Sequence, residues 1–282
     1  MKPAADNLAL AFKSLWGAST IPFCAGVRPA FEHPHFEAIS ARINQLCALC
    51  ASGVVHGANG SGKSYLINHV LQSSLSEKQF KTVVLTHSSL SGSDLLRALC
   101  LALDLQPKFR RSDNVAQINQ AWKTLGHRWP VLILEEAQNL SAVALEELRL
   151  LSCAKLDTVA FSLLLVGDNA LLANLRLGIH APLRSRLSYS LELCPLDAQT
   201  SRQYIEHALK SATIHDNPFQ PEALELLIRA GGGLPRTINH LAQRAMEAAA
   251  AAKSLEVSAA HVTSAIDRIP WLVNLLHQER SA

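Results

Sequence analysis

Residues 57–64 read Gly57-Ala58-Asn59-Gly60-Ser61-Gly62-Lys63-Ser64 and fit the pattern G-x-x-x-x-G-K-[ST]. The glycines let the backbone curl until successive N–H groups point inward and form a nest for an anion. In such a loop the lysine ammonium reaches the β- and γ-phosphates of a nucleoside triphosphate, and the serine hydroxyl binds Mg²⁺. The pattern therefore predicts an ATP–Mg²⁺ site made by Gly57, Asn59, Gly60, Ser61, Gly62, Lys63 and Ser64.

The sequence on each side of this loop supports that interpretation. Ser52–His56 is a short run typical of a buried strand that leads into the loop. Tyr65–Leu71 has the spacing of a helix that leaves it, with its N-terminus aimed at the phosphates. A Gly/Ser turn that matches the pattern by chance would not be expected to have both a strand before it and a helix after it.

A second motif places two carboxylates at the end of an apolar run. Val131–Leu134 is continuously aliphatic, as expected of a central parallel strand covered on both faces, and Glu135 and Glu136 follow it. A carboxylate that faces the phosphate loop suits Mg²⁺, and a second one can polarise the attacking water. We assign Glu135 to the metal, through water, and Glu136 to general base or water orientation. The alternative is an ordinary acidic strand end.

Strands alternate with helices through the first two thirds of the chain. We expect strands at residues 52–56, 80–86, 131–135, 161–167 and 189–193. We expect helices at residues 36–51, 65–71, 91–103 and 114–125. This alternation predicts an α/β fold with a doubly wound parallel sheet, whose ligand lies at the carboxyl ends of the strands.

From Pro195 onward the pattern is helical only. Helices are expected at residues 198–211, 221–230, 235–252 and 258–269, each bounded by a cap residue or by proline and glycine. A small all-helical domain therefore follows the sheet domain. Pro270-Trp271-Leu272 begins a short tail, whose tryptophan is expected to dock on this helical domain or on a neighbouring molecule.

Several motifs in a fixed order resemble one family. Glu136-Ala137-Gln138-Asn139-Leu140 is similar to the D-E-A-Q-N-L box of the ExeA-like and TnsC/TniB-like AAA+ ATPases, and the similarity continues through Leu145–Leu151. Leu164–Gly167 lies where that family has its sensor-one strand. Leu183–Leu187 lies at the arginine-finger position, and Gly232–Arg236 resembles the sensor-two G-x-P-R. The resemblance implies an N-terminal segment (1–29), an AAA+ domain (30–195), a helical lid (196–269) and a tail (270–282).

The resemblance also implies roles for individual residues. Asn169 stands near the sensor-one position and would orient a water, although the family commonly has glutamine there and this chain has Asp168-Asn169. Arg186 would reach into the site of the next subunit, with Arg184 as the rival candidate. Arg236 would contact the γ-phosphate and couple the lid to the nucleotide state.

One departure from the family pattern concerns the metal. The family has aspartate where this chain has Glu135. The extra methylene moves the carboxylate by about 1.5 Å, one C–C bond, and active sites are sensitive to displacements of that size. We therefore expect ATP binding to persist and hydrolysis to be slow.

A local basic cluster is the strongest indication of a nucleic-acid partner. The net charge of the whole chain is only +3, which argues weakly for DNA. Lys108, Arg110 and Arg111 surround Phe109 in a loop between predicted helices, and such loops can follow a phosphate backbone. Nothing in the cluster reads base edges, so double-stranded DNA would be bound without strong sequence preference. A solvated loop is the alternative.

Two function classes follow from these features, with a third left open. The first is a DNA-associated regulator resembling TnsC, TniB, IstB and MuB, which assembles with ATP into a ring or helical filament on DNA and recruits or regulates a transposase. The second is an ExeA-like ATPase that assembles a secretion or envelope machine. The third is nucleotide-gated signalling without DNA.

The composition favours a cytoplasmic protein without a membrane contact. No apolar stretch approaches the ~20 residues that span a bilayer, and the N-terminus lacks a signal-peptide pattern. We expect neither the membrane anchor nor the peptidoglycan-binding region of the secretion members.

Cys47 and Cys50 form a C-x-x-C, but buried free thiols fit better than zinc or redox chemistry. Pro22-Phe23 resembles the family's "PF" stretch near the adenine, and core packing is the equal alternative for Phe23.

Overall fold

The computed structural model describes residues 3–24, 31–86, 90–153 and 161–269, and for residues 3–6 it describes the backbone alone. The predicted tail, residues 270–282 with Pro270-Trp271-Leu272, lies outside the described residues. The chain divides into two compact units. The sheet unit comprises residues 34–59 and 63–194. The helical unit comprises residues 1–33, 60–62 and 195–282.

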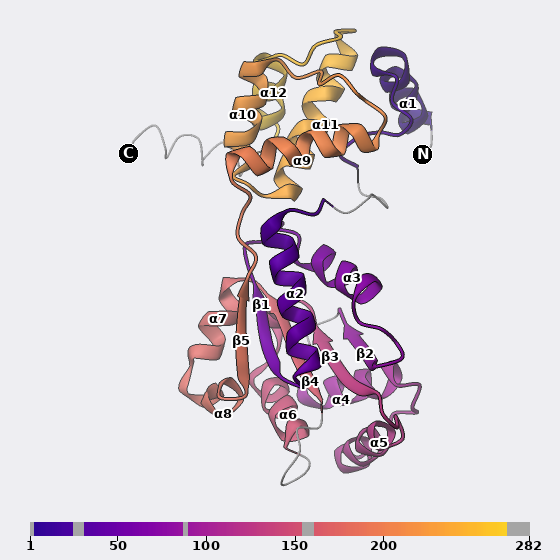
Figure 1. Cartoon of the computed structure of the whole chain (residues 1–282), viewed down its shortest axis with the longest axis vertical. Coiled ribbons are helices and arrows are strands. Elements are labelled where there is room, and N and C mark those ends of the chain that lie inside the picture. Colours follow the sequence, from indigo (N-terminus) through magenta and orange to yellow (C-terminus); the bar gives the residue numbers. More distant parts are fainter. Residues whose placement is uncertain (1–2, 25–30, 87–89, 154–160, 270–282) are drawn as a thin grey trace. The chain divides into compact units, whose positions relative to one another are not determined.

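A parallel five-stranded sheet organises the sheet unit, as the alternating pattern predicts. Its strands lie in the order β2-β3-β4-β1-β5 (Figure 1). Their bounds are β1 Ser52–His56, β2 Phe80–Leu85, β3 Trp129–Leu134, β4 Ser162–Gly167 and β5 Leu187–Glu192. The first strand of the sequence, β1, therefore lies between β4 and β5. The carboxyl ends of β1, β3 and β4 meet at one edge of the sheet.

Helices cover both faces of this sheet (Figure 1). One face is covered by α2 (Pro34–Ala48) and α3 (Lys63–Ser73), which pack with Val55 and Ile133. On the other face Val54 and Leu132 pack with α4 (Gly92–Ala102), α6 (Ala142–Ser152) and α7 (Asn169–Arg176). Successive strand residues thus enter opposite cores, which explains why the central strands are continuously apolar.

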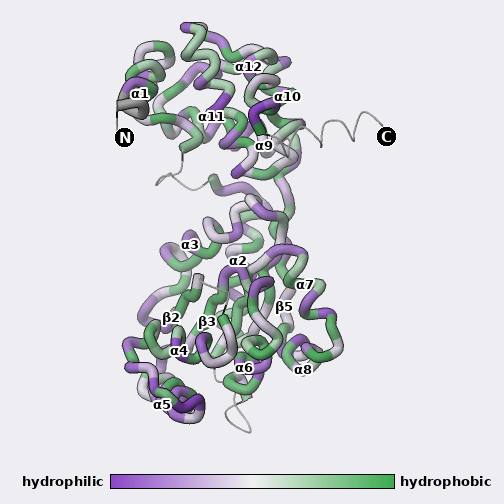
Figure 2. Tube along the Cα trace, turned by 180° about the vertical axis from the view of Figure 1, so that it is seen from behind, coloured by the Kyte–Doolittle hydropathy of each residue, from purple (hydrophilic) through white to green (hydrophobic). Residues whose placement is uncertain are grey.

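The remaining elements of the sheet unit are short or polar. Helix α5 spans Arg111–Lys123 and carries mostly hydrophilic residues (Figure 2). The short helices are η1 (Ala137–Asn139), η2 (Gly178–His180) and α8 (Ala181–Arg184). Capping side chains fix two helix starts, because Ser91 accepts the Asp94 N–H before α4 and Ser141 accepts the Ala144 N–H before α6.

The helical unit contains the predicted helices and one that was not predicted. The predicted ones are α9 (Ala198–Ser211), α10 (Pro221–Gly231), α11 (Pro235–Ala251) and α12 (Ala259–Asp267). The additional helix α1 spans Pro3–Trp16 and packs on α11 (Figure 1). Its Phe12 is fully buried, and the indole N–H of Trp16 donates to the carbonyl oxygen of Leu255 at 2.7 Å.

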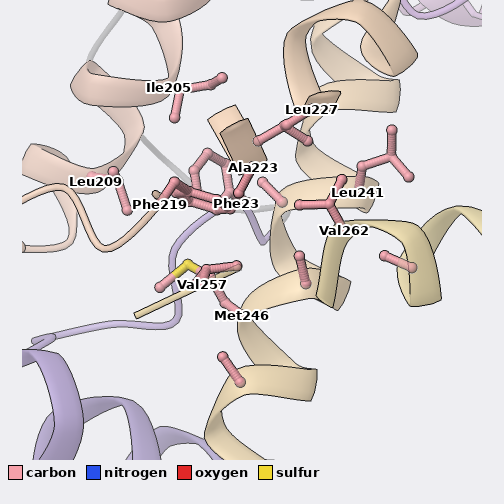
Figure 3. Packing of buried hydrophobic residues seen from close by; sticks show 14 of the residues in the cluster. Phe23, Ile205, Leu209, Phe219, Ala223, Leu227, Leu241, Met246, Val257 and Val262 are labelled. Atoms are coloured by element: carbon pink, nitrogen blue, oxygen red, sulfur yellow. The ribbon is translucent and has the colours of Figure 1, made fainter. Parts of the chain in front are cut away.

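Phe23 belongs to the hydrophobic core of the helical unit (Figure 3). It is 2% exposed, and its ring meets that of Phe219 edge to face at a centroid distance of 6.5 Å. Around this pair lie Ala223, Leu227, Leu241, Met246, Val257 and Val262 (Figure 3). Of the two interpretations of the Pro22-Phe23 stretch, the structure therefore supports core packing for the phenylalanine.

Both cysteines of the C-x-x-C pair are free thiols; Cys47 is buried and Cys50 is partly exposed. Burial raises the pKa of Cys47 to about 12, and the neighbouring Cys50 adds to the effect. Within the described residues, no cluster of three histidine, cysteine or acidic side chains could hold a metal ion. No helix in the described part of the chain is long and apolar enough to cross a membrane.

Candidate nucleotide-binding site

The phosphate loop has the backbone that its glycines predict. Strand β1 ends at His56, the loop follows directly, and α3 begins at Lys63. Gly60 has φ +86° and Gly62 has φ +103°, conformations that favour glycine because it has no Cβ. A substituted residue at either position would strain the curl on which an anion nest depends.

Lys63 and Ser61 show that the loop fits a polyphosphate. The Lys63 side chain is buried, and its ammonium donates to the carbonyl oxygens of Gly57 at 2.9 Å and Ala58 at 3.1 Å. The buried Ser61 hydroxyl has no hydrogen-bond partner among the described residues. Buried polar groups normally have partners, so an orphaned hydroxyl beside a buried cation is consistent with a binding site for a polar anion.

Ser64 and Glu135 bring the loop and β3 together. The Ser64 hydroxyl donates directly to Oε2 of Glu135, which is buried at the carboxyl end of β3. A hydroxyl and a carboxylate are oxygen ligands of the kind that Mg²⁺ prefers. The donor set that the sequence predicts for the metal, Ser64 and Glu135, is therefore assembled at one point, and it fits the ion.

Glu136 is placed differently from its neighbour. Its side chain is exposed, and its backbone lies in the left-handed region at φ +51°. Its Oε2 accepts a hydrogen bond of 2.7 Å from Nε2 of Gln138. The left-handed backbone turns the chain out of β3 at this residue. As a result, two consecutive glutamates reach different environments.

The turn between β4 and α7 contacts the phosphate loop through Asp168. Its Oδ1 accepts the Ala170 N–H at 2.8 Å and caps α7, and its Oδ2 lies 3.4 Å from Nδ2 of Asn59. Asn169 is exposed as the first residue of α7. The sequence-based assignment of water orientation to Asn169 stays a prediction. The carboxylate of Asp168 is held by a helix N-terminus and an amide.

Gln138 has contacts that sequence reasoning did not assign. Besides the bond to Glu136, its Oε1 accepts the Asp168 N–H at 3.4 Å, and its carbonyl oxygen accepts Nδ2 of Asn174 at 3.2 Å. The sequence feature that could have pointed to Gln138 is its position in the Glu136–Leu140 motif, two residues after the candidate base.

His56 is a second residue whose place the sequence did not reveal. Its imidazole is buried at the end of β1, with Nε2 3.3 Å from the Ser190 hydroxyl and Nδ1 without a partner among the described groups. Burial lowers the pKa of His56; Lys63 lowers it further, whereas Glu192 opposes the shift. The ring is therefore held neutral next to the phosphate loop.

The two candidate finger arginines differ in their contacts. Arg184 donates from Nη1 to the carbonyl oxygen of Leu175 at 2.7 Å, near the end of α7. Arg186 is exposed and donates to the carbonyl oxygen of Pro182 and, at 3.0 Å, to the thiol of Cys153. No carboxylate in the described part of the chain forms an ion pair with Arg186. Glu146 on α6 feels its charge, because Arg149 and, more weakly, Arg186 lower the pKa of that carboxyl. The role of Arg186 in a neighbouring subunit stays a prediction.

Arg236 is the second residue of α11 in the helical unit. It follows Gly232 and Gly233, which have φ +56° and +69°. A Cβ on Gly233 would lie 2.1 Å from the carbonyl oxygen of Leu196, so this turn depends on glycine. The contact of Arg236 with the γ-phosphate stays a prediction.

One residue of the predicted DNA-binding cluster, Arg111, forms an ion pair within the sheet unit. The guanidinium of Arg111 donates from Nε and Nη2 to both carboxylate oxygens of Glu147, each at 2.6 Å. Glu147 is buried on α6, and this bidentate bond raises the pKa of Arg111. The guanidinium thus serves a structural ion pair, and its predicted contact with DNA stays a prediction.

The other residues of the cluster remain exposed on an ordered loop. Lys108 and Arg110 are exposed, and Phe109 between them is 93% exposed. Buried Asn114 fixes the loop, because its Oδ1 accepts the Lys108 N–H at 2.7 Å and its Nδ2 donates to the Lys108 carbonyl oxygen at 3.0 Å. The loop therefore presents an aromatic ring between two cations.

Sequence comparisons relate the chain to one domain family and to one secretion-pathway protein. Residues 48–175 match the family model described as an AAA domain. The chain is 28% identical over 257 residues to the General secretion pathway protein A of Aeromonas hydrophila. The match covers 87% of this chain but only 46% of that relative, so the chain spans about half of its length.

Solved structures show the same fold at low sequence identity. Cdc6p from Pyrobaculum aerophilum matches with a TM-score of 0.72 at 16% identity, over 88% of this chain and 70% of that one. The Aeropyrum pernix ORC1 protein in complex with DNA matches with 0.65 at 17%, over 85% and 66%. The Thermotoga maritima RuvB Holliday junction branch migration motor matches with 0.55 at 17%, over 83% and 69%. The chain thus has the P-loop AAA+ fold.

Proposed function

We propose that the protein binds ATP with Mg²⁺ at residues 57–64 and hydrolyses it. One observation carries this proposal: the Ser64 hydroxyl donates to Glu135 beside a loop that holds the buried ammonium of Lys63. A cation, a metal donor pair and an anion nest converge at the carboxyl edge of the sheet. This is where ligands bind in doubly wound folds.

Each residue has a role that its chemistry supports. The loop N–H groups and Lys63 bind the phosphates, while Ser64 and Glu135 hold Mg²⁺, with Glu135 acting through water. When bound, the ion neutralises charge that builds up on the β- and γ-phosphates. Glu136 accepts the proton of the attacking water or orients it, and Asn169 and Arg236 contact the water and the γ-phosphate.

We further propose that ATP drives assembly of identical subunits into a ring or helical filament. The exposed guanidinium of Arg186 supports this, because an exposed cation can stabilise transition-state charge in the site of the next subunit. Such a head-to-tail interface closes into a ring or continues as a helix.

Double-stranded DNA is the partner that we propose for this assembly. Lys108, Phe109 and Arg110 support it, since repeated copies of an ordered cationic loop can follow a phosphate backbone. Contacts with the phosphate backbone carry no sequence information directly, so we expect weak sequence preference. Recruitment or regulation of a transposase is the finer role proposed for the DNA-bound assembly.

A second candidate function has its own support. The relative named General secretion pathway protein A favours an ATPase that assembles a secretion or envelope machine. Under that alternative the exposed Lys108–Arg110 loop would contact a protein, and DNA would have no effect on assembly.

Sedimentation with duplex DNA separates the two candidates. The protein is mixed with a slowly hydrolysed ATP analogue and with two duplexes of equal length and unrelated sequence. We expect large complexes only when nucleotide and DNA are both present, with similar affinity for both duplexes and a steep loss of binding as salt rises. A protein that stays monomeric with both ligands would reject the DNA role and favour the secretion alternative.

A further inference from the structure

Gln138 joins three elements that surround the candidate catalytic acid. It lies in η1, and its side chain is half-buried. Its Nε2 donates to Oε2 of Glu136 at 2.7 Å, its Oε1 accepts the Asp168 N–H at 3.4 Å, and its carbonyl oxygen accepts Nδ2 of Asn174 at 3.2 Å. The side-chain amide therefore donates to one partner and accepts from another.

The end of β4 leaves room for this amide only because residue 167 is glycine. A Cβ on Gly167 would lie 2.6 Å from Oε1 of Gln138. The bond from Asn174 on α7 holds the backbone of Gln138 from the other side. The amide is thus held by its surroundings, whereas the side chain of Glu136 is exposed and accepts a hydrogen bond from Gln138.

The same contacts continue to the phosphate loop within the sheet unit. Asp168, whose N–H reaches Gln138, also lies 3.4 Å through Oδ2 from Nδ2 of Asn59. The residues Glu136, Gln138, Asp168 and Asn59 therefore form a continuous chain of polar contacts. An amide suits the second position, because it can donate to a carboxylate and accept from an N–H at once.

We infer that Gln138 is a positioning residue that fixes the carboxylate of Glu136 and ties its orientation to the phosphate loop through Asp168 and Asn59. This inference rests on the proposed function, in which Glu136 acts on the attacking water. By engaging Oε2, the amide leaves Oε1 of Glu136 to meet the water in one orientation. A carboxylate free to rotate would meet it in several orientations, and misplacement by about 1 Å costs up to about 100-fold in rate.

Two substitutions of Gln138 remove this function in different ways. Gln138→Met keeps the length of the side chain but can neither donate nor accept strongly, and Gln138→Glu keeps its shape but places a carboxylate against Glu136. We expect kcat to fall by about 10- to 100-fold in both variants. We expect KM and the Kd for ATP to change by less than about twofold, because a group acting only on the transition state leaves ground-state binding intact.

A matched control separates positioning from general loss of structure. Gln117 on α5 also donates from its amide, at 3.0 Å to the Gln106 carbonyl oxygen and at 3.0 Å to Oδ1 of Asn114. Gln117→Met should therefore leave kcat unchanged. An equal loss of kcat in Gln117→Met, or an unchanged kcat in Gln138→Met, would overturn the assignment.

The Glu136→Gln background tests whether Gln138 acts through Glu136. Once the carboxylate is gone, Gln138→Met should cause no further loss of the residual rate. If the second substitution lowers that rate by the same factor as in the wild type, Gln138 acts independently and the inference is wrong. Absence of any hydrolysis that depends on Lys63 in the wild type would overturn both this inference and the proposed function.

A spectroscopic readout does not depend on hydrolysis. In protein labelled with ¹⁵N-glutamine, the side-chain amide signal of Gln138 is assigned by its loss in Gln138→Met. We expect this signal to shift in Glu136→Ala and to stay in place in Glu146→Ala, which removes an exposed acid that pairs with Arg149 on α6. An unchanged Gln138 signal in Glu136→Ala would show that the contact does not exist and would overturn the inference.

Discussion

At the scale of single residues, the contact between Ser64 and Glu135 sets the expected chemistry. The two side chains lie 71 positions apart in sequence and hydrogen-bond directly. The glutamate side chain is long enough to reach the hydroxyl itself. A metal ion and its water must therefore enter between two groups that already hydrogen-bond to each other. The sequence has glutamate here, where the ATPases that it resembles have aspartate.

Shortening that acid is therefore expected to speed the reaction. Glu135→Asp withdraws the carboxylate by about 1.5 Å, one C–C bond, and opens space for the hydrated ion. We predict a higher kcat and half-saturation at a lower Mg²⁺ concentration, measured by phosphate release over a Mg²⁺ titration. An equal or lower kcat would mean that the surrounding groups are adapted to glutamate.

The neutral His56 gives a prediction for stability against pH. Its pKa in the folded protein lies below the usual value of 6.5, so the unfolded chain binds a proton first as the pH falls. Protonation then favours the unfolded state, and the free energy of unfolding decreases below pH 6.5 by at most about 1.4 kcal/mol per pH unit.

Replacing the imidazole should remove this contribution. We expect the free energy of unfolding, measured by urea denaturation between pH 5.5 and 8, to fall less toward acid in His56→Gln than in the wild type. Parallel pH dependences in the two proteins would show that His56 titrates normally.

At the scale of elements, the residues between α4 and α5 and at the start of α5 are expected to have different effects on DNA binding and on the free energy of unfolding. Arg111 and Glu147 join α5 to α6, whereas Lys108 and Arg110 have exposed side chains. Arg111→Ala leaves buried Glu147 without its bidentate partner, so we expect a loss of about 1–2 kcal/mol in the free energy of unfolding, moderated because Arg111 itself is half-exposed. Urea denaturation measures this loss.

The exposed cations should show the opposite behaviour. Lys108→Ala combined with Arg110→Ala should leave the free energy of unfolding within about 0.5 kcal/mol of the wild type, as for surface changes in general. The same double variant should bind duplex DNA more weakly and with a smaller salt slope. If DNA affinity depends on Arg111 alone, Lys108 and Arg110 do not bind the duplex.

The elements themselves were largely predictable because their signals are local. Strand β1 and helix α9 coincide with their predicted bounds, and α4 begins after the predicted cluster at Ser91. Helix α1 was missed although Leu8, Phe12 and Leu15 have helical spacing, since the residues that cover it lie on α11. The sequence also showed the charge of Arg111 but not Glu147, its partner 36 positions away.

The candidate site was predictable only where a sequence motif determines which residues lie next to one another in space. The loop at 57–64 implies its own backbone, and the apolar run before Glu135 implies a strand end next to it. Gln138 and Asp168 meet because η1 and the start of α7 follow adjacent strands, and this pairing depends on strand order, which periodicity does not contain.

At the scale of the whole molecule, assembly is expected to depend on Arg186. Arg186→Ala should abolish ATP-driven assembly or lower the hydrolysis rate while each subunit still binds nucleotide, because the guanidinium acts in the neighbour's site. Arg184→Ala is the matched control, since Arg184 serves the carbonyl oxygen of Leu175. Sedimentation with ATP measures both variants, and an identical defect in the two would speak against a finger role for Arg186.

Nucleotide binding by the Lys63 variant tests the central claim most directly. Affinity for ATP–Mg²⁺ is measured by calorimetry for the wild type, for Lys63→Ala and for Lys78→Ala, in which an exposed lysine beyond α3 is removed. The account predicts that Lys63→Ala abolishes measurable binding and that Lys78→Ala binds as the wild type does. Near-wild-type affinity in Lys63→Ala would contradict the assignment of residues 57–64 as the ATP site.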